Sequence, residues 1–334
     1  QGRFLTDTDF SQLAFSDSVS AAVETLKSRP SYSCAFEAAG DGELDRSRIE
    51  QLLWLSLYRD YSSLYRFAAV SQRKFLDLYF MHFEVDILKK CLRDAASSRS
   101  SDLDLSIFED FFQKHSHLDL AGLAECSSLD SFVEGLRGSF YYEPLRRLRD
   151  QGVTALFDYE SALDSLYFIH LWKDMKKQLG RKELEAVSQC IGEKIDLLNL
   201  EWLSRAKEYY RLSDHAIEDF LIPVYYKLRK DQIRAMAQAV SREEFLGILR
   251  TTRYGNRIFG QPDPSSGQEN PRLKRLFRSL LDAVYQTSGR KNPYSAAVLN
   301  FYFKEEEIRK LITTIEGIRY QLDGNEILSC LAES

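Results

Sequence analysis

The chain has 334 residues, of which 44% are hydrophobic and 28% are charged, and its formal net charge is −5 at pH 7. This composition excludes wholesale disorder, and the acidic balance argues against a nucleic-acid-binding protein, which normally carries a basic excess. No run of about 18 apolar residues is present, so we expect no membrane-spanning helix. Strand-like Val-Ile-Thr alternation is nearly absent, whereas Leu, Ala, Glu, Lys and Arg are abundant, and this pattern predicts an all-α fold.

The predicted elements of the first hundred residues are helices and short loops. A helix over 19–26 follows the N-cap candidate Ser18 and stops at Pro30, because proline disfavours helix in the residue before it. Residues 31–43 read as a loop, and 44–93 have a long, aromatic helical pattern. A polar stretch over 95–102 predicts a connection to a second unit.

The second unit begins near residue 103. Ser127 and Asp130 resemble a capping arrangement before a helix over 132–136. Two longer helices are expected over 159–178 and 190–210, and Gly180 is a plausible C-terminal cap of the first.

The third unit begins at Ser213 with a helix over 216–220, and a capping box at Ser241 and Glu244 precedes a helix over 245–249. The stretch 255–271 is rich in Gly and Pro and predicts the longest loop. Helices over 273–285 and 295–321 follow, and nothing after 324 needs to be rigid. On the last helix one apolar stripe faces a partner, formed by Ile308, Leu311, Ile312, Ile315 and Ile318.

Landmarks recur along the chain at a period of about 110 residues. Leu-Ala or Met-Ala pairs begin at positions 13, 123 and 236, with nearly equal shifts between them. An aromatic follows each copy at a similar distance, at Tyr32, Tyr141/Tyr142 and Tyr254, and an acidic residue opens a later apolar helix at Asp86, Asp196 and Glu307. Two landmarks that keep the same shift favour three copies of one unit, with bounds at 1–102, 103–212 and 213–334.

No constellation of residues predicts catalysis, cofactor binding or metal binding. The segment 255–260 has the glycine spacing of a phosphate loop, but Gln261 and Pro262 stand where the loop needs Lys and Ser or Thr. The imidazoles of His115 and His117 would point to different sides of a helix. The five cysteines are scattered without C-x-x-C spacing, so we expect no disulfide framework or zinc site and a reducing, cytoplasmic environment.

Several segments, in order, resemble a known family. The opening 2–5, the helix segment 83–93, the motif Ile195-Asp-Leu-Leu-Asn-Leu200 and the ending 301–309 are similar to the C subunit of the archaeal and bacterial V-type (A/V-type) ATPases, the counterpart of the d subunit of eukaryotic vacuolar ATPases. The likeness covers almost the whole chain. It departs at Lys89, which stands where the first copy of the motif would carry Asn. Family members also usually carry a short aromatic and basic helix before the first repeat.

The resemblance implies three similar helical bundles arranged as a funnel with pseudo-threefold symmetry. It further implies a non-catalytic central-stalk rotor adaptor. Such an adaptor links the central-shaft subunits to the membrane rotor ring and transmits torque for ion or proton transport and ATP synthesis. The expected location is peripheral, on the cytoplasmic side of the membrane through the ring, and the isolated chain is expected to be a monomer.

The loops after the first helix of each repeat are candidates for a partner interface, at Tyr32, Tyr142 and Tyr254, because tyrosine joins a large apolar ring to a polar tip. An alternative reading is a cytosolic helical scaffold that binds other proteins and is unrelated to ion pumps. A period near 110 residues argues against the common solenoids, whose repeats are about 20–50 residues long.

Overall fold

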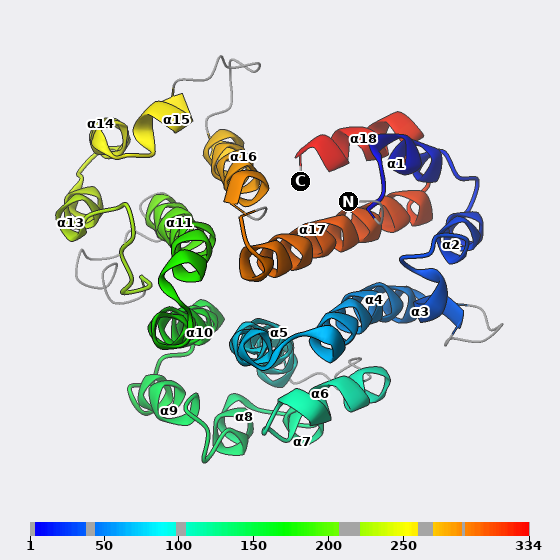
Figure 1. Cartoon of the computed structure of the whole chain (residues 1–334), viewed down its shortest axis with the longest axis horizontal. Coiled ribbons are helices and arrows are strands. Elements are labelled where there is room, and N and C mark those ends of the chain that lie inside the picture. Colours follow the sequence, from blue (N-terminus) through cyan, green and yellow to red (C-terminus); the bar gives the residue numbers. More distant parts are fainter. Residues whose placement is uncertain are drawn as a thin grey trace. The chain divides into compact units, whose positions relative to one another are not determined.

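The regular structure of the chain is helical wherever it is described. The computed structural model describes residues 4–37, 44–97, 105–206, 221–259, 270–288 and 291–333 (Figure 1). Within these ranges no strand is present, as the composition predicts, and no helix is long and apolar enough to cross a membrane.

The helices fall into a long and a short group, and the long ones follow one another in pairs along the chain. The long ones are α4 (Arg46–Phe67), α5 (Val70–Ser97), α10 (Leu156–Gln178), α11 (Arg181–Arg205), α16 (Asn270–Ser288) and α17 (Pro293–Arg319). The shorter ones are α1 (Asp7–Ala14), α2 (Val19–Lys27), α3 (Ser33–Glu37), the 3-10 turn η1 (Ser106–Phe108), α6 (Glu109–His115), α7 (Leu120–Ala124), α8 (Leu129–Gly135), α9 (Tyr142–Asp150), α13 (Lys230–Gln238), α14 (Arg242–Thr251), α15 (Gly255–Phe259) and α18 (Gly324–Glu333).

The chain divides into two compact units whose bounds differ from those of the sequence repeats. Unit 1 joins residues 1–68, 104–114 and 299–334, and unit 2 joins 69–103 and 115–298. Each unit therefore combines segments that are distant in the sequence.

Unit 1 is held together by aromatic packing on α4 and by the chain's last helices. The ring of Tyr58 stacks on Phe111 at a centroid distance of 4.5 Å and meets Phe108 edge-on at 5.1 Å. On the other side of the unit, α1 packs against α18 (Figure 1). Nothing in the sequence required ordered structure after 324, but α18 lies there, buries Ile327 and packs on α1.

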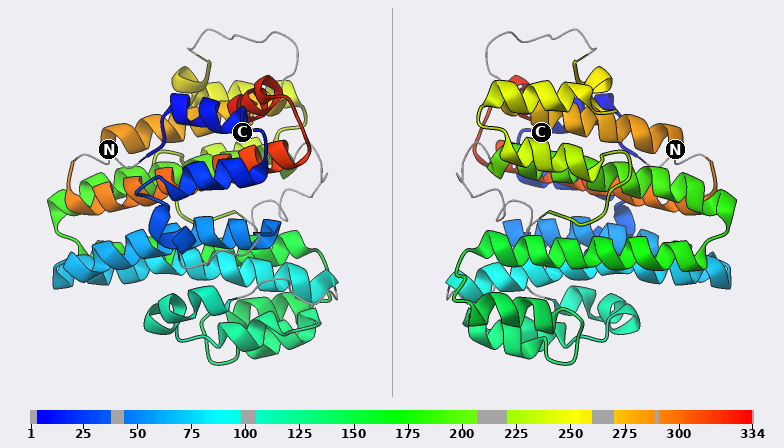
Figure 2. Two further views of the ribbon diagram at one scale, coloured as in Figure 1. Left: turned by 90° about the vertical axis from the view of Figure 1, so that its right-hand side faces the viewer. Right: turned by 90° about the vertical axis from the view of Figure 1, so that its left-hand side faces the viewer.

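Unit 2 is built on two long helix pairs, α5 with α10 and α11 with α16. α5 and α10 run antiparallel, since Arg93 meets Glu160 at 2.5 Å, Lys89 meets Asp164 at 2.8 Å and His82 lies beside Tyr167. Figure 2 shows these two helices side by side.

The helices begin and end close to the predicted positions, with informative exceptions. The pattern over 44–93 breaks at residues 68–69 into α4 and α5, and both predicted loops, 31–43 and 255–271, contain a short helix. Gly180 does not cap α10; it is the N-cap residue of α11, with extended backbone. Ser128, not Ser127, caps α8, and it exchanges bonds with Ser131.

The third unit follows its prediction in part. Ser241 caps α14 by accepting from the Glu244 amide, but the Glu244 carboxylate accepts from the Val240 amide rather than completing the box. The predicted stripe on α17 is confirmed at four positions, because Ile308, Leu311, Ile315 and Ile318 are buried. The predicted helix over 216–220 lies outside the described residues.

Candidate functional site

Three tyrosines occupy corresponding positions in the three predicted repeats. Tyr32, Tyr141 and Tyr254 each stand immediately before a short helix, α3, α9 or α15. Each of them is at most 1% exposed. Each of these buried phenol hydroxyls therefore needs a hydrogen-bond partner within the protein.

Each of these tyrosines donates its hydroxyl proton to a buried carboxylate. Tyr32 donates to Glu307 at 2.5 Å, Tyr141 to Glu84 at 2.7 Å, and Tyr254 to Asp196 at 2.8 Å. The three acids lie on the long helices α17, α5 and α11, and all are at most 6% exposed. We call each tyrosine–acid pair, together with the further donors described next, a carboxylate clasp.

Every clasp also holds the chain segment that leads into a repeat. Glu307 accepts from the Leu5 amide at 2.5 Å, and Glu84 accepts from the Ser116 hydroxyl at 2.5 Å. Asp196 accepts from the successive amides of Tyr226, Lys227 and Leu228, at 3.1, 2.6 and 3.0 Å. One carboxylate therefore fixes two points of the neighbouring segment, its entry and its tyrosine.

The clasps connect the predicted repeats in cyclic order. Glu84 of the first repeat binds the tyrosine of the second, 57 residues away, and Asp196 of the second binds that of the third, 58 residues away. Glu307 of the third binds Tyr32 of the first across 275 residues. Two clasps lie within unit 2 and the third lies within unit 1, so no repeat satisfies its own tyrosine.

The clasps correct the register of the first repeat. The acid landmark there is Glu84 rather than Asp86, and in this register a buried leucine follows each acid by four residues, at Leu88, Leu200 and Leu311. Asp86 instead approaches the Lys89 ammonium at 3.4 Å. The aromatic of the second repeat is Tyr141, not Tyr142.

The corrected register also moves the position of the motif asparagine. Asn199 lies three residues after Asp196, and its side chain bonds to both the carbonyl and the amide of Ile222, at 3.0 and 2.9 Å. The residues three positions after the other two acids are Ile87 and Lys310. The departure from the family pattern in the first repeat therefore falls on Ile87, not on Lys89.

Burial keeps the clasp tyrosines protonated. Desolvation first, and the adjacent carboxylate second, raise the pKa of Tyr32, Tyr141 and Tyr254 far above its ordinary value. Desolvation also raises the pKa of Asp196, although its four hydrogen bonds act in the opposite direction. The phenols therefore act as hydrogen-bond donors, a structural role.

The electrostatic surroundings of the three clasps differ at one position, three residues before each acid. Met81 occupies it in the first clasp. In the second, Glu193 is fully buried and accepts from Lys227 and from Arg257, the latter at 2.7 Å. In the third, Lys304 is 2% exposed, donates to Glu307 at 3.2 Å and lies 3.6 Å from the Tyr32 ring centroid.

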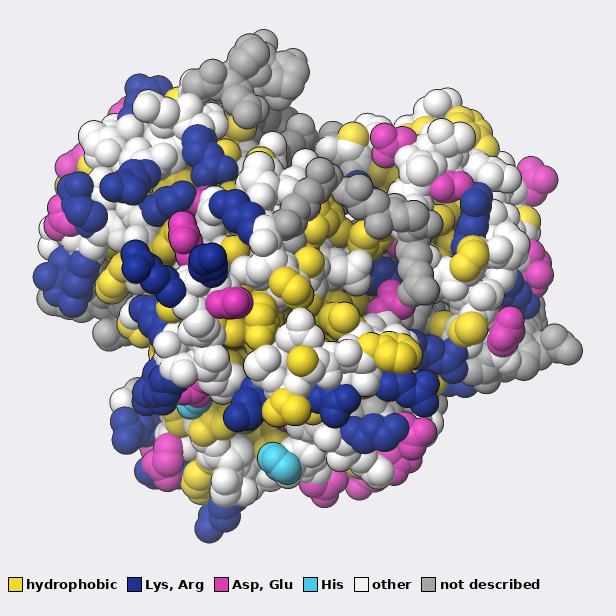
Figure 3. All heavy atoms as spheres, in the orientation of Figure 1, with side chains coloured by type: hydrophobic (Ala, Val, Ile, Leu, Met, Phe, Trp, Pro, Cys, Tyr) yellow, Lys and Arg dark blue, Asp and Glu magenta, His cyan; other side chains and the backbone are white. Residues whose placement is uncertain are grey.

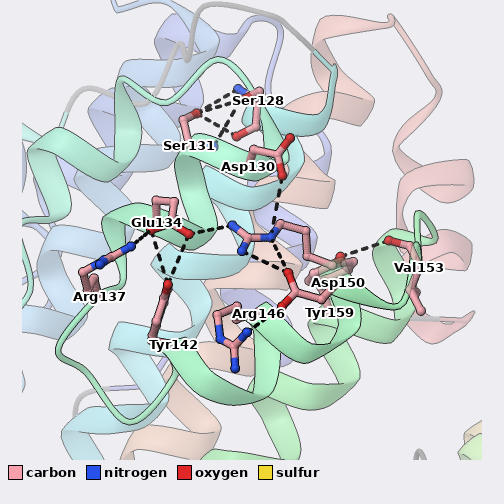
Figure 4. A network of polar contacts seen from close by, with 11 residues as sticks. Ser128, Asp130, Ser131, Glu134, Arg137, Tyr142, Arg146, Asp150, Val153 and Tyr159 are labelled. Atoms are coloured by element: carbon pink, nitrogen blue, oxygen red, sulfur yellow. Dashed lines mark hydrogen bonds and ion pairs between the residues drawn. The ribbon is translucent and has the colours of Figure 1, made fainter.

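Tyr142 lies in a solvent-exposed network of charges on α8 and α9 (Figure 4). Its hydroxyl donates to Glu134 at 3.2 Å, and Glu134 also accepts from Arg137 at 2.5 Å and Arg149 at 2.7 Å. Hydrogen bonds from Arg137 and then Arg149 lower the pKa of Glu134 to about 2. The candidate interface residues are thus of two kinds: Tyr142 is partly accessible, whereas Tyr32 and Tyr254 are buried and hold their loops from within.

Sequence periodicity found Tyr32 and Tyr254 and their acceptors Glu307 and Asp196, but it did not distinguish Tyr141 from Tyr142 and did not find Glu84. Glu84 and Asp86 both fit the spacing of the repeats, and only packing distinguishes them. Among the described residues, no group of three His, Cys, Asp or Glu side chains could hold a metal ion. The segment 255–260 has the glycine spacing of a phosphate loop, and its residues 255–259 form helix α15.

Comparison with known proteins identifies the family of this chain. The model of the ATP synthase (C/AC39) subunit family matches residues 1–330. The C subunit of the A-type ATP synthase of Pyrococcus abyssi is 29% identical over 193 residues, 57% of this chain and 50% of that protein. That of Methanocaldococcus jannaschii is 23% identical over 295 residues, 86% of this chain and 72% of that protein.

The alignment thus spans half the length of the first relative and nearly three quarters of the second. The family model, by contrast, covers all but the last four residues of the chain. The chain therefore belongs to the C/AC39 family of ATP synthase subunits.

Proposed function

We propose that this chain is a non-catalytic adaptor in the central rotor of an A/V-type ATP synthase, where it joins the central shaft to the membrane rotor ring. The observation that carries the proposal is the cyclic set of carboxylate clasps, in a chain whose family consists of ATP synthase subunits. An adaptor on a rotation axis must resist twisting between its two partners.

The clasps supply such resistance because each ties two distant points of the chain to one rigid helix. A hydrogen bond to a charged group stabilises by about 1.5–3 kcal/mol, and each clasp contains at least two. Close-packed helix interiors deform little. Three bundles closed around one axis as a funnel, with pseudo-threefold symmetry, are the arrangement that we propose for this set of clasps.

In the proposed role the chain hydrolyses no ATP and translocates no ions by itself. It couples the two processes on the cytoplasmic side of the membrane, as a peripheral subunit present in one copy and monomeric when isolated. A cytosolic scaffold unrelated to ion pumps is the competing role, and it requires neither the shaft nor the ring.

Reconstitution separates the two roles. Purified chain is mixed with shaft subunits and with rotor ring in detergent, and ternary assembly is followed by size exclusion. Ion uptake driven by ATP is then measured in vesicles with and without the chain. We expect a ternary complex and uptake only with the chain present; binding to neither partner would refute the rotor role.

The proposed interface at Tyr32, Tyr142 and Tyr254 is tested in the same assay. Tyr142→Ala removes a partly accessible ring and should weaken one of the two contacts directly. Tyr32→Phe and Tyr254→Phe keep the buried rings but lose the clasp bonds, so they should weaken binding only by loosening the loops. Unchanged affinity for both partners in all three variants would remove these loops from the interface.

A further inference from the structure

Basic side chains gather at one end of unit 2. This end is formed by residues 70–77, 173–185 and 291–294, which together carry eight cations and four carboxylates. The whole chain, in contrast, has a net charge of −5. The cations are Arg73, Lys74, Lys173, Lys176, Lys177, Arg181, Lys182 and Lys291, and the carboxylates are Asp77, Asp174, Glu183 and Glu185. We call this region the basic end.

Packing within unit 2 brings these segments together. The antiparallel contact between His82 and Tyr167 places the start of α5 level with the end of α10, because these ends lie about twelve and eleven residues away from the contact, roughly 17 Å in each case. The start of α17 joins them, since the Tyr294 hydroxyl donates to Ser71 at 3.1 Å. The Asn292 side-chain amide donates to the Glu183 carbonyl at the start of α11, at 3.3 Å.

The charges of this end are mostly uncompensated. Asp174 is paired with Lys177 at 2.9 Å, and Asp77 approaches His115 at 3.6 Å. Among the described residues, Lys74, Lys173, Arg181 and Lys182 form no ion pair, and all four are exposed. Figure 3 shows Lys and Arg side chains gathered over α5 and α10 on this face.

The composition of the basic end favours a lipid surface over a protein partner. Six of its eight cations are lysines, and lysine is depleted in protein–protein interfaces. Flexible lysines do suit a layer of anionic headgroups, where each cation near the surface adds roughly fivefold to binding. Val70, 72% exposed, adds an apolar side chain at the same end.

We propose that the basic end of unit 2 binds anionic phospholipid headgroups. The contact is peripheral and reversible, because no described helix is apolar and long enough to enter the bilayer fully. The lipid contact needs neither shaft nor ring, so it can be tested on the isolated chain and is independent of the proposed rotor role.

Vesicle flotation tests the proposal. The full chain is incubated in about 50 mM salt with vesicles of phosphatidylcholine alone or with about a third of phosphatidylglycerol, conditions under which surface charges are weakly screened. The double variant Lys173→Glu/Lys182→Glu is compared with Lys230→Glu/Arg253→Glu. The control pair is equally charged and exposed but lies near Asp196, which is about 14 residues or roughly 21 Å along α11 from Lys182.

We expect flotation only with the anionic vesicles, at least tenfold weaker binding of the first double variant, and less than a threefold loss in the control. Circular dichroism confirms that both variants are folded. Three results would overturn the proposal: no binding to the anionic vesicles, equal losses in the two double variants, or displacement by inorganic phosphate at matched ionic strength, which would assign the surface to free phosphate.

Discussion

The Tyr32 hydroxyl donates to the Glu307 carboxylate at 2.5 Å, although 275 residues separate the two in the sequence. The same pairing recurs at Tyr141 with Glu84 and at Tyr254 with Asp196. Because the chemistry is repeated while the neighbours differ, the three clasps form a series in which single substitutions can be compared.

The first prediction concerns the number of donors on each carboxylate. Tyr141→Phe leaves Glu84 with the Ser116 hydroxyl as its other donor, so we expect a loss of about 2 kcal/mol in the free energy of unfolding. Tyr254→Phe leaves Asp196 with three backbone amides, and we expect about half that loss. Urea unfolding measures both.

The adjacent residue supplies the control for this comparison. Tyr142→Phe removes one bond from a solvent-exposed network, and its effect should stay within about 0.5 kcal/mol. Equal losses for Tyr141→Phe and Tyr142→Phe would contradict the clasp.

The second prediction concerns the buried pair of Lys304 and Glu307. Glu307→Gln removes a charged partner of the Lys304 ammonium, which is 2% exposed, and should cost about 3–5 kcal/mol. Lys304→Met places at this position the residue that the first clasp already has there, Met81. We expect the double variant Lys304→Met/Glu307→Gln to be more stable than Glu307→Gln alone in thermal unfolding. The reverse order would show that the buried ammonium does not destabilise the fold when residue 307 is glutamine.

The third prediction is a loss of stability at alkaline pH. The pKa of each clasp tyrosine is raised in the folded chain from its ordinary value near 10, so above about pH 10 only the unfolded chain releases these protons. The tyrosines thus contribute stability that is present below pH 10 and is lost as the pH rises further. The free energy of unfolding should therefore fall less steeply with pH in Tyr141→Phe, by up to about 1.4 kcal/mol per pH unit. Urea titrations between pH 9 and 11 measure this slope. Tyr320→Phe, at a 69% exposed position outside the clasps, is the matched control variant.

The fourth prediction concerns thiol reactivity. Burial raises the pKa of both Cys91 and Cys190 to about 12, whereas Cys34 and Cys330 are exposed. Because the thiolate is the reactive form, Cys34 and Cys330 should react quickly with a disulfide reagent at pH 8. Cys91 and Cys190 should react only after unfolding, and rapid modification of four or more thiols in the native chain would contradict their burial.

The sequence was sufficient for the helical class and for the positions of Tyr32 and Tyr254, because these depend on composition and periodicity, whereas it did not distinguish Tyr141 from Tyr142. It was insufficient for the acid of the first repeat, since Glu84 and Asp86 lie two positions apart on one helix and point to different sides. Only the packing of α5 against its neighbours decides which of them faces Tyr141.

The pairing of segments was also beyond the sequence. Spacing aligns Tyr32 with Tyr141 and Tyr254, but it does not say that each tyrosine binds the acid of another repeat. The helix α18 was missed for a similar reason: its short apolar face becomes ordered by packing against α1, which lies at the opposite end of the sequence.

The clasp between Tyr32 and Glu307 has a consequence for synthesis on the ribosome. At about 5–20 residues per second, roughly 15–55 s pass between the emergence of Tyr32 and that of Glu307. During this interval the segment that carries Leu5 and Tyr32 lacks its acceptor, whereas Glu84 and Asp196 meet their tyrosines after only 57 and 58 further residues. Of the three clasps, the one whose tyrosine is made first is therefore the last to be completed, and the segment that carries Leu5 and Tyr32 most needs protection from misfolding and proteolysis while translation continues.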